Sequence, residues 1–299
     1  PRDPENGLLA EQVMVLKSDK RNNLWIGSFS GGLSYFDTKK NRFTHYPNLA
    51  PYSKSADRYN IKAIHIDKKN RVWVASESRG LSLYDSVKQV FHPIRNSTFP
   101  NDLTILSIYE DKTGALWLGT NGVGLIYFNP DKKITTIYNK KNGLANNVIY
   151  SIQQDNRTGH FWVSTNKGLS ELDPEKLEVR NYNRTDGLQG NQYNPGSTFK
   201  CDDGTLLFGG INGMDAFVPE RIETSSYLPE IVFTSFFLNN VKLNVQDTLS
   251  PLKENIILTK AIDLKHSQNS FSVEFAILEY SFSERNQYAY MLEGLDKQW

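Results

Sequence analysis

The stretch LSIYEDKTGALWLGTNGVGLIYFN, residues 106–129, contains the pattern that decides the fold. Alternation at residues 106–109 predicts a short strand, and a turn at residues 111–114 separates it from a second strand at residues 116–118. A Gly-rich turn then precedes a third strand at residues 125–128. Alternation bounded by Gly and Asp is typical of hairpins and not of helices. The stretch therefore predicts one antiparallel unit of three strands.

The same pattern occurs five times along the chain. The copies are NNLWIGSFSGGLSYFD (22–37), NRVWVASESRGLSLYD (70–85), GALWLGTNGVGLIYFN (114–129), GHFWVSTNKGLSELD (159–173) and GTLLFGGINGMDAFV (204–218). Their anchors are spaced 48, 44, 45 and 45 residues apart, and they are Trp25, Trp73, Trp117, Trp162 and Leu207. A period of about 40–50 residues with several strands per repeat predicts a β-propeller in which each repeat is one blade.

The recurring positions have structural tasks. An Asp can accept backbone N–H bonds in the first turn of four copies, at Asp19, Asp67, Asp111 and Asp155. A residue that tolerates the left-handed conformation follows at Asn22, Asn70, Gly114, Gly159 and Gly204. A glycine precedes the third strand at Gly32, Gly80, Gly124, Gly168 and Gly213. We expect a fourth strand in each blade, with the sequence signal at residues 43–46, 90–92, 134–138 and 179–182.

The repeat stops after residue 220. Residues 231–243 predict two strands around a turn at Asn239 and Asn240, and further short strands are expected at residues 256–258, 270–277 and 288–292. This spacing is similar to that of β-sandwiches. We therefore predict an all-β chain with two domains: five four-stranded propeller blades over residues 1–220, and a sandwich over residues 221–299 that is incomplete at its C-terminal end.

Composition and motifs exclude several classes of function. Lys and Arg number 34 against 33 Asp and Glu, so the net charge of +1 implies no general attraction to nucleic acid or to an anionic membrane. Cys201 is the single cysteine, which excludes a disulfide framework. The sequence has no apolar run near 18 residues and none of the common hydrolase, metalloprotease or phosphate-binding motifs. We expect no catalytic residue, no metal and no cofactor.

The repeats resemble the regulator-propeller repeat, and the end of the chain, YAYMLEGLDKQW (288–299), resembles the Y_Y_Y domain, an Ig-like sandwich. In this order they resemble the periplasmic sensor region of hybrid two-component system histidine kinases of glycan-degrading gut bacteria. The resemblance implies that the blades are part of a seven-bladed propeller and that the domain lies in the periplasm and binds an oligosaccharide. It also implies a homodimer, no nucleic-acid partner for this part, and membrane contact only through a helix C-terminal to this sequence.

Ligand contacts are expected in the loops. In a propeller, the connections between blades and the loops between second and third strands emerge on the same face. Amides, guanidinium groups and tyrosine rings in these loops suit sugar hydroxyls and sugar rings, and Arg79 and Lys167 suggest an acidic sugar. The candidate ligand-binding residues are Arg58, Tyr59, Asn60, Glu77, Arg79, Asn121, Asn166, Lys167, Asn191, Tyr193 and Asn212.

Two other functions stay open. The propeller could be a scaffolding or dimerisation module, with the ligand site elsewhere in the full protein. It could also be a polysaccharide lyase or hydrolase, which needs two carboxylates about 5–10 Å apart in a cleft. The acidic residues available for that chemistry are Glu77, Glu110, Asp186 and Asp215.

Overall fold

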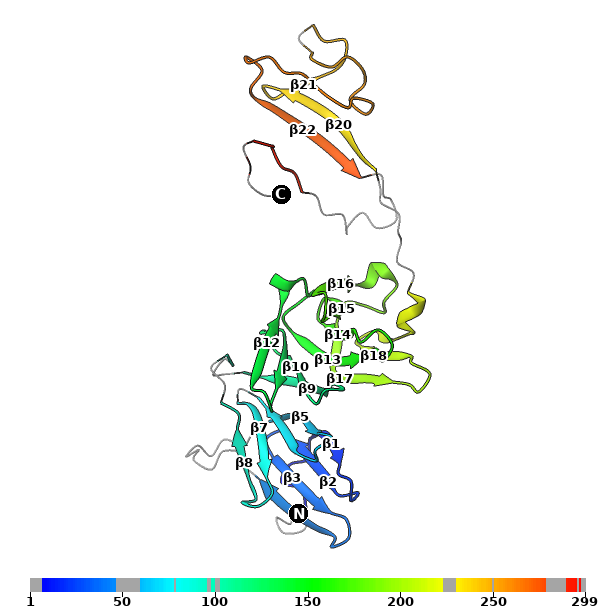
Figure 1. The fold of residues 1–299 in the computed structure, drawn as a ribbon. Helices are drawn as coiled ribbons and strands as arrows, with labels where there is room; N and C mark the ends of the chain where they lie inside the picture. Colours follow the sequence, from blue (N-terminus) through cyan, green and yellow to red (C-terminus); the bar gives the residue numbers. More distant parts are fainter. Residues whose placement is uncertain are drawn as a thin grey trace. The chain divides into compact units, whose positions relative to one another are not determined.

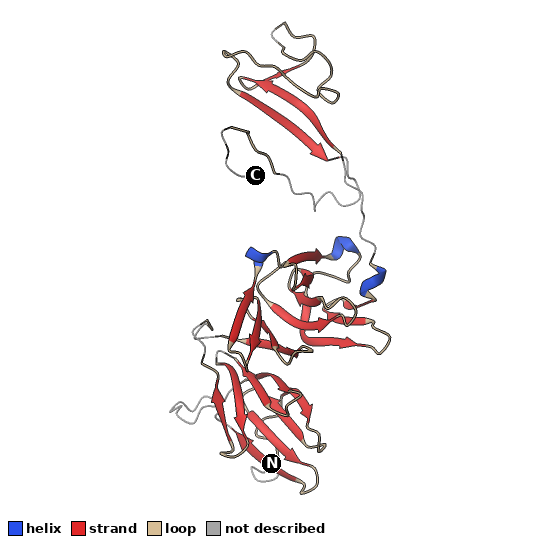
Figure 2. Cartoon of the chain, viewed as in Figure 1, coloured by secondary structure: helices blue, strands red, loops and turns tan. Residues whose placement is uncertain are grey.

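A computed structural model of the chain describes residues 7–46, 60–77, 79–95, 98–99, 103–222, 230–248, 250–277, 289–294 and 296. The chain divides into two compact units, Pro1–Ile222 and Glu223–Trp299. Antiparallel strands are the main regular structure of both units (Figure 2), and the short 3-10 helices of the described residues are η1 (Lys140–Asn142), η2 (Arg184–Asp186) and η3 (Pro219–Arg221). The predicted all-β class is confirmed.

The first unit contains successive antiparallel sheets, one for each repeat (Figure 1). The first sheet has β1 (Val13–Ser18), β2 (Leu24–Ser28), β3 (Gly32–Asp37) and β4 (Arg42–Tyr46). The second has β5 (Ile61–Ile66), β6 (Val72–Ser76), β7 (Gly80–Asp85) and β8 (Val90–Pro93). The third has β9 (Ile105–Glu110), β10 (Leu116–Thr120), β11 (Leu125–Asn129) and β12 (Ile134–Tyr138). The fourth has β13 (Ile149–Gln154), β14 (Phe161–Thr165), β15 (Gly168–Asp173) and β16 (Glu178–Tyr182).

The fifth sheet differs from the prediction. It has three strands, β17 (Tyr193–Lys200), β18 (Leu206–Gly210) and β19 (Gly213–Phe217), because the chain forms η3 after β19 and does not return along the sheet. The expected fourth strand of this blade was therefore wrong. Leu207 replaces the tryptophan of the other repeats and is only half-buried. The number of blades in the intact propeller stays a prediction.

The first turn of each sheet has the conformation that its sequence predicts. The φ angles are 63° at Asn22, 62° at Asn70, 84° at Gly114, 80° at Gly159 and 89° at Gly204. Asn and Gly are the residues that adopt this left-handed conformation at low cost. The hairpin between the first two strands is therefore encoded locally, in a few consecutive residues.

The turn aspartates also accept hydrogen bonds as predicted. Oδ1 of Asp111 accepts the backbone N–H of Thr113 at 2.8 Å and that of Ala115 at 3.2 Å, and Oδ2 accepts the indole N–H of Trp117 at 2.9 Å. The same carboxylate-to-indole bond joins Asp67 and Trp73 at 2.9 Å. In the second and third sheets this bond fixes the tryptophan ring to the turn of its own sheet.

The fourth sheet lacks this bond. Its tryptophan, Trp162, follows the turn aspartate Asp155 by seven residues, whereas six separate Asp111 from Trp117. Asp155 instead accepts a bond from the Thr158 hydroxyl at 2.8 Å, and the buried indole nitrogen of Trp162 has no hydrogen-bond partner among the described residues. The turn of the fourth sheet is one residue longer than that of the third.

Neighbouring sheets pack face to face through the anchors. Trp117 is buried with Ile149 and Phe161 of the fourth sheet, and the rings of Trp117 and Phe161 lie 3.9 Å apart. Similar apolar clusters join the first sheet to the second, the second to the third, and the fourth to the fifth. The first strands β1, β5, β9, β13 and β17 contact one another in order, and β17 also contacts β9. The sheets are therefore propeller blades that converge on their first strands.

A small residue in the second strand permits this convergence. Gly119 on β10 lies so close to the fourth sheet that a Cβ atom there would be 2.8 Å from the carbonyl oxygen of Ile149. Gly27 on β2 has the same relation to Ile61, whose Cγ2 would lie 2.5 Å from an added Cβ. Glycine in a strand often marks such a close approach of neighbouring segments.

The second unit has a three-stranded sheet in the order β21 (Val241–Leu243), β20 (Ile231–Leu238), β22 (Phe271–Ile277). The predicted turn at Asn239 and Asn240 is confirmed, with φ angles of 49° and 64°. The strand expected at residues 256–258 was wrong, because these residues form a turn in which Leu258 N donates to Asn255 O at 2.8 Å. No strand is found in the described part of residues 288–292, which excludes Tyr288.

Candidate functional site

Two kinds of loop lie side by side on one face of the first unit, which we call the loop face. The loops between second and third strands form hydrogen bonds with the connections between sheets. Asn121 N donates to Thr104 O at 2.9 Å, and Gly122 N donates to Asn147 O at 3.1 Å. The loop between β10 and β11 is thus attached both to the connection before its own sheet and to the connection after it. The predicted proximity of the two kinds of loop is confirmed.

The connections before the fourth and fifth sheets have the same internal geometry. A short 3-10 helix, η1 or η2, begins at an Asn cap and ends at a left-handed glycine, Gly143 with φ 98° or Gly187 with φ 89°. The side chain of a second Asn then accepts a hydrogen bond from the first backbone N–H of the helix. Lys140 N donates to Asn147 Oδ1 at 2.9 Å, and Arg184 N donates to Asn191 Oδ1 at 2.8 Å. The side chain of the candidate residue Asn191 therefore stabilises its connection, although the residue is exposed.

Asn60 and Glu77 form one polar cluster on the loop face. Asn60 Nδ2 donates to the Glu77 carboxylate at 2.8 Å, and Lys62 Nζ lies 3.2 Å from the same carboxylate oxygen. Asn60 Oδ1 also accepts the backbone N–H of Ser30 at 2.8 Å. These bonds from Asn60 and Lys62 lower the pKa of Glu77, so the carboxylate is ionised at neutral pH.

The remaining candidates differ in accessibility. Tyr193 is 1% exposed and its hydroxyl donates to Asp215, so its ring is in the core and not on the surface. Arg58 and Tyr59 lie outside the described residues. The candidates whose side chains are exposed on the loop face, besides Glu77 and Asn191, are Arg79, Asn121, Asn166, Lys167 and Asn212.

The acidic residues considered for hydrolysis all have hydrogen-bonding roles in the fold. Asp215 is buried and accepts the backbone N–H of Gln189 at 2.7 Å, and Asp186 accepts that of Asn183 at 2.7 Å. Glu110 accepts the backbone N–H of Lys68 at 3.0 Å, on the opposite side of the sheets from the loop face. A general acid needs a raised pKa, whereas the pKa of Glu77 is lowered by its bonds to Asn60 and Lys62.

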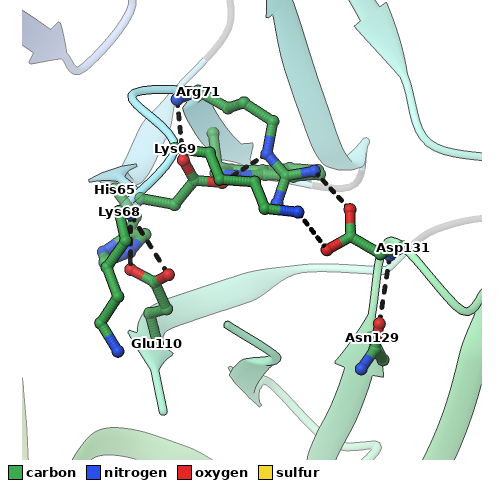
Figure 3. Close-up of polar contacts among 9 residues, drawn as sticks. His65, Lys68, Lys69, Arg71, Glu110, Asn129 and Asp131 are labelled. Carbon is green, nitrogen blue, oxygen red and sulfur yellow. Dashed lines mark hydrogen bonds and ion pairs between the residues drawn. The ribbon is translucent and has the colours of Figure 1, made fainter. Parts of the chain in front are cut away.

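The opposite side carries the turns between first and second strands and between third and fourth strands, and we call it the turn face. Figure 3 shows Lys69 and Arg71 converging on Asp131 across the gap between the second and third sheets, at 2.7 and 3.1 Å. In the same view His65 Nε2 lies 3.2 Å from Glu110. Burial lowers the pKa of His65, although Glu110 acts in the opposite direction. These pairs join residues of neighbouring sheets that are 45 to 62 positions apart in the sequence.

Lysines on the turn face link one sheet to the next, a feature that sequence reasoning missed. Lys68 Nζ donates to Asp111 O at 2.9 Å, Lys112 Nζ donates to Asn156 O at 3.2 Å, and Lys200 Nζ donates to Gln154 O at 3.0 Å. Lys68 and Lys112 each follow a turn aspartate. The recurrence of lysine at this position was the available signal, but it does not reveal which carbonyl each amine reaches.

Two further kinds of site were searched in the described part of the chain. No group of three or more His, Cys, Asp and Glu side chains could hold a metal ion there. Within the same residues, no helix has the length and apolar character needed to cross a membrane.

Comparison with known proteins supports the repeat assignment. The family described as "Two component regulator propeller" matches residues 98–122 and 143–167. Histidine kinase P4 of Formosa agariphila is 35% identical over 109 residues, which are 36% of this chain and 8% of that kinase. These findings confirm the resemblance to two-component regulator propellers.

Solved structures give similar matches. The extracellular domain assigned to a hybrid two component system of B. thetaiotaomicron is 24% identical, with a TM-score of 0.48, over 98% of this chain and 45% of that domain. The β-propeller domain of Cps50 (Swd1) from Myceliophteria thermophila is 11% identical, with a TM-score of 0.49, over 73% of this chain and 69% of that domain. Residues 98–122 and 143–167 of this all-β chain are therefore similar to two-component regulator propeller repeats. It spans less than half of the sensor domain that it resembles.

Proposed function

We propose that this chain is the extracytoplasmic, periplasmic sensing part of a two-component sensor and that an oligosaccharide binds its loop face. The single observation that carries the proposal is the combination of regulator propeller repeats with a loop face that presents exposed amides and cations. The chain itself catalyses no reaction in this proposal. A histidine kinase outside this sequence receives the signal, and the receptor acts as a homodimer.

The side chains left exposed on the loop face fit a sugar ligand. Asn121, Asn166 and Asn212 occupy corresponding loops of the third, fourth and fifth sheets, and each amide offers both donors and an acceptor. Lys167 adds a cation beside Asn166. The loop backbones are held by their hydrogen bonds to the connections, so a ligand meets groups that are already positioned.

Signalling requires the ligand to favour one arrangement of the receptor over another, because equal affinity for both shifts no equilibrium. The connections on the loop face are bonded to loops of two neighbouring sheets. A saccharide that contacts loops of more than one sheet could therefore bind one relative orientation of the sheets more tightly. This difference in affinity is what the receptor would transmit.

The test is calorimetric titration of the chain with a panel of neutral and acidic oligosaccharides. We expect at least one to bind, and Asn166→Ala combined with Lys167→Ala to weaken binding by about tenfold, or 1.4 kcal/mol. Lys176→Ala, an exposed lysine in a turn of the same sheet on the turn face, is the matched control and leaves affinity unchanged. Absence of binding by every saccharide, to this chain and to the complete sensor region, would refute the proposal.

A scaffolding role is the second candidate, and one observation favours it. Phe199 on β17 and Met214 on β19 are 62% and 59% exposed on the fifth sheet, and Met14 and Leu16 on β1 are 51% and 57% exposed on the first. A contiguous patch of such side chains on either sheet would mark a contact surface. If the complete sensor region still binds a saccharide after loop-face substitutions in this chain, the scaffolding role is favoured.

A further inference from the structure

We propose a second saccharide site, on the turn face in the notch between the first and second sheets, that binds an acidic oligosaccharide. The notch is a cavity of about 850 Å³. Specific ligands occupy clefts of about 300–1,000 Å³. The notch is separate from the loop face, so the inference goes beyond the proposed function.

The gaps between sheets differ in the residue that faces the tryptophan of the preceding sheet. The residue before each tryptophan packs against the tryptophan of the preceding sheet. Phe161 does so against Trp117, with ring centroids 3.9 Å apart. The equivalent residue facing Trp25 is Val72, a smaller side chain that lines the notch. Between the second and third sheets the equivalent is Leu116, and the corresponding cavity is about 460 Å³.

Aromatic rings form the walls of the notch. Trp25 is the buried floor, with Tyr35 and Tyr84 on either side at centroid distances of 4.7 and 5.1 Å. Tyr35, Tyr84 and Phe43 are partly exposed, so their rings are accessible to a ligand. Amphipathic rings of this kind offer an apolar surface against which a sugar ring can pack.

Hydroxyl and amide groups lie beside these rings. The hydroxyls of Tyr46 and Tyr84 are 2.9 Å apart, and the Tyr84 hydroxyl donates to Gln89 Oε1 at 2.7 Å. The amide nitrogen of Gln89 donates to Ser86 O at 2.7 Å. Thr44 and Asn70 also line the notch. Sugar hydroxyls can donate to and accept from such groups.

The rim is positively charged. Lys20, Arg21 and Arg42 line the notch, and none of them has an ion-pair partner among the described residues. The two carboxylates of the rim, Asp19 and Asp37, already accept two backbone N–H bonds each. Unpaired guanidinium groups recognise carboxylate and sulfate groups through charge-assisted bonds.

Together, ring faces and hydroxyl partners inside a cationic rim match an oligosaccharide of uronic acids. An acidic peptide would use the rim but not the combination of ring walls and hydroxyl groups. We therefore assign the notch to an acidic oligosaccharide.

The experiment titrates the chain with tetragalacturonate, with a neutral galacto-oligosaccharide of equal length and with polyglutamate. We expect tetragalacturonate to bind at least about tenfold more tightly than either of the others. Val72→Phe places a ring against Trp25, in the position that Phe161 occupies against Trp117 between the third and fourth sheets. We expect it to reduce the affinity for tetragalacturonate at least about tenfold. Arg21→Glu combined with Arg42→Glu changes only exposed side chains and is expected to have the same effect. Leu116→Phe is the matched control and leaves binding unchanged.

The outcomes separate this inference from the proposed function. In one outcome, tetragalacturonate binding is lost when residues 166 and 167 are changed but survives both Val72→Phe and the double arginine change. This outcome overturns the notch site and keeps the loop-face site. Equal binding of polyglutamate overturns the saccharide assignment. Failure of tetragalacturonate to bind also overturns the notch site, whatever other saccharides do at the loop face.

Discussion

The indole nitrogen of Trp117 donates a 2.9 Å hydrogen bond to the carboxylate of Asp111, six residues earlier. The corresponding indole in the fourth sheet, that of Trp162, has no partner among the described residues, although it is equally buried. The two tryptophans therefore share a position in the repeat and differ in one hydrogen bond.

This difference predicts unequal costs for the same substitution. Both Trp117→Phe and Trp162→Phe remove the same ring volume, but only the first breaks a buried hydrogen bond and leaves a carboxylate oxygen of Asp111 unpaired. We expect Trp117→Phe to lower the free energy of unfolding by about 1–2 kcal/mol more than Trp162→Phe. Urea unfolding followed by circular dichroism measures both, and equal losses would contradict the role of the bond.

The close approach at Gly119 predicts a steric effect. In Gly119→Ala the new Cβ would lie 2.3 Å from Ser107 Oγ and 2.8 Å from Ile149 O, so the third and fourth sheets must move apart. We expect a loss of stability of about 1–3 kcal/mol in thermal or urea unfolding. The matched control is Gly209→Ala in the fifth sheet, where the nearest atom is 3.1 Å away. A loss as large in the control would show that general strand effects dominate.

Asp67 predicts a pH dependence of stability. Burial acts to raise its pKa, but hydrogen bonds from Trp73 and Arg71 outweigh burial, and the pKa of Asp67 is lowered. Its stabilising contribution is therefore complete above the pKa of an unfolded Asp, about 3.9, and is lost as the pH falls through the lower folded value. Asp67→Asn should be less stable than the natural protein at about pH 7, and the difference should shrink towards about pH 2. An equally large difference at both pH values in urea unfolding would contradict this assignment.

Asn191 predicts a local change on the loop face. Its side chain accepts the backbone N–H of Arg184, which begins η2. In Asn191→Ala we expect faster amide hydrogen exchange at residues 184–187, with little change in the core strands. Asn166→Ala, in an exposed loop of the preceding sheet, is the control. Unchanged exchange at residues 184–187 would show that the connection is held by other contacts.

The sequence by itself determined the strands and turns of the first unit. The bonds that define them join near neighbours, such as Asp111 with Ala115, and the left-handed positions are occupied by Asn or Gly. Local geometry of this kind needs no knowledge of the rest of the chain. The same local reasoning failed at residues 256–258, where a short apolar run forms a turn, because such runs do not distinguish a strand from other structures.

The tertiary structure decided which side chains meet between sheets. Tyr193 occupies a loop-face position in the sequence, yet its ring is in the core because it begins β17 and its hydroxyl reaches Asp215. The contacts of Lys68 with Asp111 and of Arg71 with Asp131 join residues 43 and 60 positions apart. The notch over Trp25 lies between two sheets and is lined by Val72 and Tyr84 of the second. Such features depend on how closely two sheets approach, and packing between distant segments sets that distance.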